Sequence, residues 1–284
     1  MDTGQSWHPA GHWLALTSFG GARVHYVRPS PRAGPPLLLI HGFAQSSWAW
    51  RFVLPALCQH FDVIAVCLPG LGWSDKPLDA EYRYPAQVAR LVELLDKLAL
   101  PSAHLCGNSL GGALAMQLAA VQPQRVRRLV LVGPAAHGLF PAALLAELQH
   151  EAMAPLWTLP GFDLLLRLGL RHGAYKHLPV DDHYMAHFLA PLRSAGAVQV
   201  TLRIARSFRK DLEALEPLLP RIHAPTLLIW GAHDRLVPRH IVRHVLRRVP
   251  QTRLSVYADS GHCPQEEEPA RFAAEVQAFL QEAR

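Results

Sequence analysis

A serine between glycines is the first feature of the sequence that could do chemistry. Residues 107–111 read Gly-Asn-Ser-Leu-Gly, and they lie between a strand-like run and a run of good helix formers. The glycines allow a strand and a helix to approach each other around a sharp turn, which exposes the Ser109 hydroxyl. A helix N-terminus also favours developing negative charge. The pattern therefore predicts that Ser109 is a nucleophile.

A serine hydroxyl needs a general base, and the base needs a group that orients it. His262 lies between the last predicted strand and the last predicted helix, and Asp234 lies in the loop that leaves the preceding strand. The carboxyl ends of parallel strands meet at one edge of a sheet, where ligands bind. We therefore predict a catalytic triad of Ser109, Asp234 and His262, in the chain order expected for such a turn.

The predicted triad needs hydrogen-bond donors for an oxyanion. The strand-like run 36–40 is followed by His41-Gly42-Phe43, so the backbone N–H of Phe43 is expected to face the serine. The N–H of Leu110, which follows the nucleophile, would be the second donor. One such donor is worth roughly 3 kcal/mol to a transition state.

Some neighbouring residues are candidates for contact with the substrate. For His41, bracing of its loop is the favoured interpretation and substrate contact is the alternative. Asn108 precedes the nucleophile, where it could contact substrate or brace the loop. Trp157 belongs to an apolar helical stretch, and Cys263 could reach the pocket rim.

Alternating strand-like and helix-like runs must position these residues. Strands are predicted at 22–27, 36–40, 62–66, 103–107, 127–133, 225–231 and 252–258. Helical spacing of apolar residues is predicted at 84–100, 111–122, 239–249 and 269–283. Strands that alternate with crossover helices predict an α/β fold with a mostly parallel sheet flanked by helices. Residues 134–218 carry helical runs at 140–157, 162–173 and 198–215 without strands between them, which predicts a helical insertion into a core made of residues 1–133 and 219–284.

Composition limits the class of protein. Of 284 residues, 50% are hydrophobic and 18% are charged, which predicts a packed core. We expect a cytoplasmic protein without stable membrane insertion, because no apolar run spans a bilayer and no signal peptide is evident. The four cysteines are scattered, which favours reduced thiols, and no metal or other cofactor is expected.

The net charge of +6 does not by itself indicate a nucleic-acid partner. Its densest basic segment, 239–253, alternates with apolar residues at helical spacing, as in a surface helix. A small molecule is therefore the expected partner, and the oligomeric state stays open.

Five segments together resemble the α/β-hydrolase superfamily, especially bacterial esterases and meta-cleavage-product hydrolases that cleave carbon–carbon bonds. The segments are HGF (41–43), LPGLGWSDKP (68–77), GNSLGG (107–112), GAHDRLVP (231–238) and SGHCPQEEEP (260–269). The resemblance implies the α/β-hydrolase fold with a cap, or lid, inserted after the sixth core strand. Haloalkane dehalogenases and epoxide hydrolases of this superfamily use aspartate at the position of Ser109, so the serine argues against both.

The leading functional prediction is a serine hydrolase of carboxylesterase type, which cleaves an ester of a small or medium apolar substrate through an acyl-enzyme. One alternative is a carbon–carbon hydrolase acting on a vinylogous diketone. The resemblance weakens it, since such enzymes commonly carry tryptophan where this chain has Cys263. A second alternative is a catalytically silent receptor for a small molecule.

Overall fold

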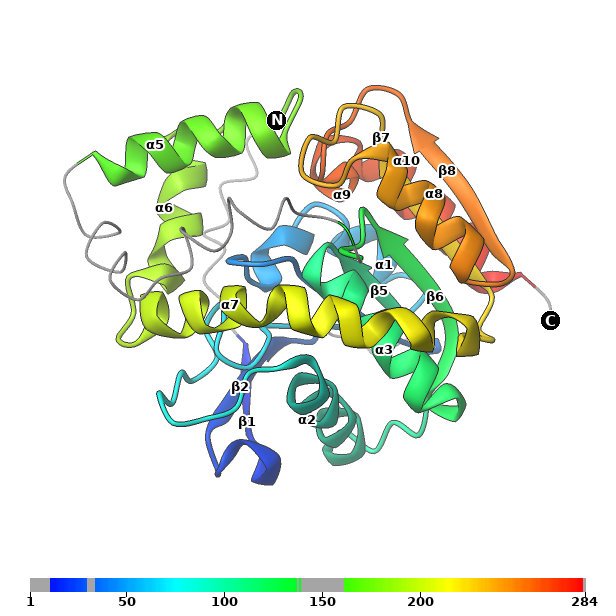
Figure 1. Cartoon of the computed structure of the whole chain (residues 1–284), viewed down its shortest axis with the longest axis horizontal. Helices are drawn as coiled ribbons and strands as arrows, with labels where there is room; N and C mark the ends of the chain where they lie inside the picture. Colours follow the sequence, from blue (N-terminus) through cyan, green and yellow to red (C-terminus); the bar gives the residue numbers. More distant parts are fainter. Residues whose placement is uncertain (1–10, 30–33, 137, 139–160, 283–284) are drawn as a thin grey trace.

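The fold is centred on an eight-stranded sheet with the order β1-β2-β4-β3-β5-β6-β7-β8 (Figure 1). The computed structural model describes residues 11–29, 34–136, 138 and 161–282. The strands are β1 (His12–Ala15), β2 (Arg23–Val27), β3 (Pro36–Ile40), β4 (Asp62–Val66), β5 (Ala103–Asn108), β6 (Val126–Val132), β7 (Thr226–Gly231) and β8 (Thr252–Tyr257). β1 pairs with β2, and β2 pairs with β4, in antiparallel orientation. All the other neighbouring strands, including β3, pair in parallel.

Helices connect the strands and cover the sheet. The α-helices are α1 (Leu54–Leu57), α2 (Tyr84–Lys97), α3 (Leu110–Val121), α5 (Phe162–Gly169), α6 (Asp182–Leu192), α7 (Ala197–Leu215), α8 (Arg239–Arg248), α9 (Pro264–Glu267) and α10 (Pro269–Gln281). Shorter helical turns are η1 (Thr17–Phe19), η2 (Ser47–Trp50), η3 (Pro123–Arg125), η6 (Glu216–Arg221) and the π-helical turn η5 (Leu170–Ala174).

Both faces of the sheet are buried, which explains why its central strands are nearly continuous apolar runs. In β3, Leu38 and Ile40 join the core cluster that contains residues of α2, α3, α7 and α8. The alternate residues Leu37 and Leu39 join the cluster on the other face, with residues of α1 and α10. The alternation of side chains along a strand therefore fills two cores at once.

The α/β-hydrolase fold predicted from the sequence is confirmed, and each predicted strand coincides with an observed one to within about a residue at each end. Among the strands and α-helices, β1, α6 and the four-residue helices α1 and α9 were not predicted. β1 is short and its side chains are mostly exposed, so it lacks a buried apolar pattern. α6 contains Pro191, which interrupts the pattern typical of a helix.

The elements α5, η5, α6 and α7 follow β6 and precede β7 in the chain (Figure 1). The helical runs predicted at 162–173 and 198–215 correspond to α5 with η5 and to α7. The run predicted around 140–157, including Trp157, lies outside the described residues. Within the described residues, no helix is long and apolar enough to cross a membrane. All four cysteines are free, and three of them are buried.

Candidate active site

Ser109 occupies a strained turn between β5 and α3. Its φ of 53° and ψ of −115° are unusual for a residue with a side chain, and surrounding contacts hold them in place. The Ser109 N–H donates to Val132 O at 2.9 Å, and the Ser109 carbonyl accepts from the N–H of Ala113 and of Ala135. At Gly111, a Cβ would overlap the Ile40 carbonyl, so only glycine permits this approach of helix to sheet. The sequence-predicted sharp turn is therefore present.

His262 and Asp234 form a buried pair, as the sequence predicted. The Nδ1 of His262 lies 2.8 Å from Oδ2 of Asp234, and both side chains are nearly inaccessible. The other carboxylate oxygen, Oδ1, accepts from the N–H groups of Leu236 and Val237 at 2.8 Å each. Against a carboxylate, Nδ1 must carry the hydrogen, which leaves a lone pair on Nε2. The pair can therefore present a proton acceptor to the cavity that Ser109 lines.

Gly133, the residue after β6, packs directly against this pair. Its φ is +45°, and a Cβ there would lie 2.9 Å from Asp234 Oδ2 and 3.1 Å from His262 Nδ1. The strand predicted at 127–133 ends at this glycine, but no role was predicted for it. The available signal was its place at the carboxyl end of a strand beside the predicted serine turn.

Gly133→Ala is expected to lower kcat by about 100-fold, because the new methyl group must displace the histidine or the carboxylate. Steady-state kinetics on the best ester substrate measures this. Gly20→Ala is the matched control, since Gly20 has φ +65° and open space around its Cβ position. An equal loss of kcat in both variants would contradict the explanation.

Two backbone N–H groups are available beside the serine. The N–H groups of Phe43 and Leu110 donate to no group among the described residues, and both residues line the same cavity as Ser109. The Phe43 ring packs edge-on against Phe208 of α7, with ring centroids 4.9 Å apart. Free N–H groups at this place suit the oxyanion site predicted from the sequence.

His41 is a buried brace of the loop and does not line the cavity. Its Nδ1 donates to Gly42 O at 2.7 Å, and its Nε2 accepts from the N–H of Leu68 at 3.0 Å. The structure thus supports the bracing interpretation of His41 and does not place it at a substrate contact. Burial lowers the pKa of His41 to about 4, because a charged ring would be desolvated.

The lowered pKa of His41 predicts that acid destabilises the fold. Unfolded His41 protonates near its usual pKa of about 6.5, so stability is full above that value and is lost as pH falls towards 4. We expect the free energy of unfolding to drop by about 2 kcal/mol from this group between about pH 7.5 and pH 5. Urea unfolding of wild type and His41→Gln measures the difference in slope. The exposed His223, changed to glutamine, is the control, and an equal slope in wild type and His41→Gln would refute the prediction.

The cavity has a volume of about 210 Å³ and a mostly apolar wall. Its lining combines Ser109 and His262 with the flanking loops and with residues of η5, α6 and α7. The other residues of the wall are Gly42, Phe43, Gln45, Asn108, Leu110, Ala135, Leu170, Ala174, Tyr175, Phe188, Phe208, Leu236, Val237 and Cys263. Asn108 and Cys263 therefore lie where the sequence predicted substrate contacts.

Asn108 and Cys263 also brace the site. The Asn108 amide donates to Val132 O at 3.0 Å and to His262 O at 3.2 Å. Burial raises the pKa of the Cys263 thiol, and the nearby Glu266 adds to the effect. Burial therefore disfavours the thiolate form of Cys263, which is the reactive form of a cysteine.

The end of η5 and the residues after it are hydrogen-bonded to the loop that carries His262. The His262 N–H donates to Ala174 O at 2.6 Å. Glu267 accepts from the N–H of Gly261 through Oε1 and from the N–H of Lys176 through Oε2. Residues 174–177 therefore hold the backbone of His262 and of its loop in place.

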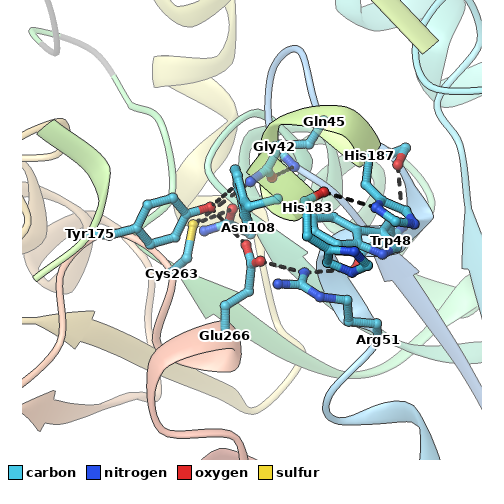
Figure 2. A network of polar contacts seen from close by, with 12 residues as sticks. Gly42, Gln45, Trp48, Arg51, Asn108, Tyr175, His183, His187, Cys263 and Glu266 are labelled. Carbon is cyan, nitrogen blue, oxygen red and sulfur yellow. Dashed lines mark hydrogen bonds and ion pairs between the residues drawn. The ribbon is translucent and has the colours of Figure 1, made fainter. Parts of the chain in front are cut away.

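A buried polar network lies beside the cavity (Figure 2). Arg51 donates to Glu266 at 2.6 Å, and the Tyr175 hydroxyl donates to the other oxygen of Glu266 at 2.9 Å. The hydroxyls of Tyr175 and Tyr184 are 2.6 Å apart. Burial raises the pKa of Glu266, and Arg51 opposes that shift. The sequence alone did not predict this network, because Arg51, Tyr175 and Glu266 lie more than 90 residues apart in the chain.

Among the described residues, no group of three or more His, Cys, Asp or Glu side chains could hold a metal ion. The groups that the described site brings together are a serine hydroxyl, an imidazole, a carboxylate and backbone N–H donors.

Comparisons with known proteins agree with this geometry. Residues 37–275 match the pattern of the Alpha/beta hydrolase family. The 2-hydroxymuconate semialdehyde hydrolase of Pseudomonas sp. strain CF600 is 33% identical over 88% of each chain. Lipase 1 of Psychrobacter immobilis is 29% identical over 93% of this chain and 83% of its own.

A solved structure shares the same architecture. The meta-cleavage product hydrolase of Pseudomonas fluorescens IP01 superposes with a TM-score of 0.80, at 25% identity, over 96% of this chain and 98% of the other. The family pattern covers the parallel strands of the sheet from residue 37 onwards, the serine turn and the His–Asp pair. This chain therefore belongs to the alpha/beta hydrolase family.

Proposed function

We propose that the protein is a serine hydrolase that cleaves a carboxylic ester of a small or medium apolar acid. His262 takes the proton of Ser109 as the serine oxygen attacks the ester carbonyl, and Asp234 orients and stabilises the imidazolium. The N–H groups of Phe43 and Leu110 bind the oxyanion. The alcohol leaves with the proton from His262, and water then releases the acid from the acyl-enzyme.

One observation carries this proposal: the strained serine and the imidazole of the buried His–Asp pair line one cavity, together with two free backbone donors. A serine in strained backbone geometry persists only where the surrounding contacts enforce it. Such a constellation is suited to acyl transfer.

The cavity wall favours an uncharged substrate. Among the described residues that line it, none is lysine or arginine, and the sequence of residues 137–160 contains neither type. A buried carboxylate without a cation would be costly. An apolar cavity of about 150 Å³ holds benzene in another protein, so this cavity suits an acyl or aryl group of about that size.

We also propose that residues 134–218 act as the cap over a core of residues 1–133 and 219–284. Leu170 of η5, Phe188 of α6 and Phe208 of α7 all contribute to the cavity wall. The cap therefore shapes the acyl pocket in this proposal, while the core supplies the reacting groups.

Hydrolysis of a carbon–carbon bond is the second candidate. It is favoured by the 33% identity to a 2-hydroxymuconate semialdehyde hydrolase, whose named substrate carries a carboxylate. The absence of lysine and arginine from the described cavity wall speaks against such a substrate here.

A substrate panel tests the proposal. p-Nitrophenyl esters from acetate to palmitate are compared with a ring-fission diketone, whose loss is followed by its absorbance. We expect the highest kcat/KM for short or medium acyl chains. A diketone kcat/KM well above that of every ester would replace the ester function by carbon–carbon cleavage.

The panel also tests the receptor alternative and the lipase activity that the name of one relative suggests. Tight binding of a small molecule with no turnover of any substrate would support a silent receptor. A sharp gain in activity when the ester forms an oil–water interface would indicate a lipase. Intact Ser109, Asp234 and His262 favour turnover.

A further inference from the structure

Gln45 places an amide head beside the serine. It lies in the loop after β3, lines the cavity and is partly buried. The Gln45 Oε1 lies 2.8 Å, and the Ser109 Cβ 3.4 Å, from the point that a Cβ on Gly42 would occupy. The amide of Gln45 and the nucleophile are therefore close neighbours across Gly42.

The orientation of this amide is determined by its partner. The Gly42 N–H donates to Gln45 Oε1 at 3.0 Å, so the oxygen must face Gly42 and the NH2 group must face the other way. The NH2 group points towards Cys263, where Nε2 lies 3.8 Å from Sγ (Figure 2). A sulfur at that distance is a weak acceptor and engages one of the two hydrogens.

Apart from the nucleophile, the polar side chains Asn108, Tyr175 and His262 of the described cavity wall have no N–H or O–H left for a substrate. Asn108 uses its NH2 group on Val132 O and His262 O. Tyr175 donates its hydroxyl hydrogen to Glu266. His262 carries its hydrogen on Nδ1, against Asp234.

Among the described side chains of the wall, Gln45 therefore has an N–H without an acceptor, as the Ser109 hydroxyl also has. The second hydrogen of this partly buried amide has no acceptor among the described residues, so an acceptor on a ligand at this place is favoured. The donor is neutral, and Arg51, the nearby cation of the polar network, is already paired with Glu266. The acceptor that fits is therefore an uncharged oxygen.

We infer that Gln45 is a specificity-determining residue that selects esters with an uncharged hydrogen-bond acceptor next to the scissile carbonyl. This inference rests on the proposed ester function. Alkoxy or keto groups on the acyl chain provide such an acceptor. The Gln45 Nε2–H donates to that oxygen while Ser109 attacks the neighbouring carbonyl.

The test uses two esters of equal size, p-nitrophenyl methoxyacetate and p-nitrophenyl butyrate, in which an ether oxygen replaces one methylene. The readout is the ratio of their kcat/KM values in wild type and in each variant. Intrinsic reactivity of the two esters cancels, because it is the same for every variant. Gln45→Met removes both amide functions, and Gln45→Glu keeps an acceptor for the Gly42 N–H but removes the pocket donor.

We expect the ratio of methoxyacetate to butyrate to fall about three- to tenfold in both variants, the value of one hydrogen bond. Gln59→Met and Gln59→Glu on the exposed surface are matched controls and should leave the ratio unchanged. An equal loss on both esters, with the ratio unchanged, would mean that Gln45 only supports the Gly42 loop and would overturn the inference. If wild type hydrolyses neither these two esters nor any ester of the p-nitrophenyl panel, the ester function itself fails.

Discussion

Ser109→Ala is expected to lower kcat by about 10⁵- to 10⁶-fold while leaving the fold intact. The catalytic groups act as a unit, so loss of the nucleophile removes nearly all of their contribution. The turn is held by hydrogen bonds of the Ser109 backbone N–H and carbonyl. Its side-chain hydroxyl makes no hydrogen bond to the described residues. The alanine variant should therefore fold, because these backbone hydrogen bonds do not depend on the side chain.

Two measurements check this expectation. Intact mass after exposure to a fluorophosphonate should show one adduct on wild type and none on Ser109→Ala, and ester kinetics should show the loss of kcat. Ser102→Ala is a matched control, because Ser102 lies before β5, at the opposite edge of the sheet, where its hydroxyl accepts from Arg127. Retention of esterase activity in Ser109→Ala would disprove the nucleophile assignment.

Asp234→Asn is expected to lower kcat by about 10⁴-fold, because His262 would then carry its hydrogen on Nε2 and not on Nδ1. An asparagine oxygen can keep the hydrogen bonds from the Leu236 and Val237 N–H groups, which fixes the side chain as in wild type. Its NH2 group then faces His262 Nδ1, which must accept instead of donate. The hydrogen moves to Nε2, and the imidazole can no longer take the serine proton.

The loss should appear in kcat with little change in thermal stability. Fluorophosphonate labelling of Ser109 should slow in parallel, because the same base activates the serine. Asp75→Asn is the matched control: Asp75 pairs with Arg23 in a partly exposed turn, so its loss should leave kcat unchanged. Unaltered labelling in Asp234→Asn would exclude the proposed role of Asp234.

The sequence by itself determined the order of the elements and the candidate triad. Central strands such as β3 and β4 are short apolar runs buried on both faces, so their composition identifies them. The glycines around Ser109 identify the turn, because a side chain at those positions would prevent the close approach of strand and helix. His262 could be chosen among 17 histidines because it follows a predicted strand at the same sheet edge as the serine.

Other features were decided only by the tertiary structure. β1 forms by pairing with β2 at the sheet edge, and its exposed side chains give no pattern of their own. The assignment of His41 needed the partners of both ring nitrogens, one of which is 27 residues away. Trp157, predicted to contact substrate, lies outside the described residues, so that prediction stays open.

The roles of Gly133 and Gln45 likewise depend on the packed chain. Gly133 matters because the Asp234–His262 pair, about 100 residues later, packs against its Cα. Gln45 offers a donor to the cavity because the Gly42 N–H determines which end of its amide faces inward. Local patterns in a sequence reflect steric and burial demands on neighbouring residues. The hydrogen-bond donors that a side chain leaves free for a ligand depend on partners that only folding brings together.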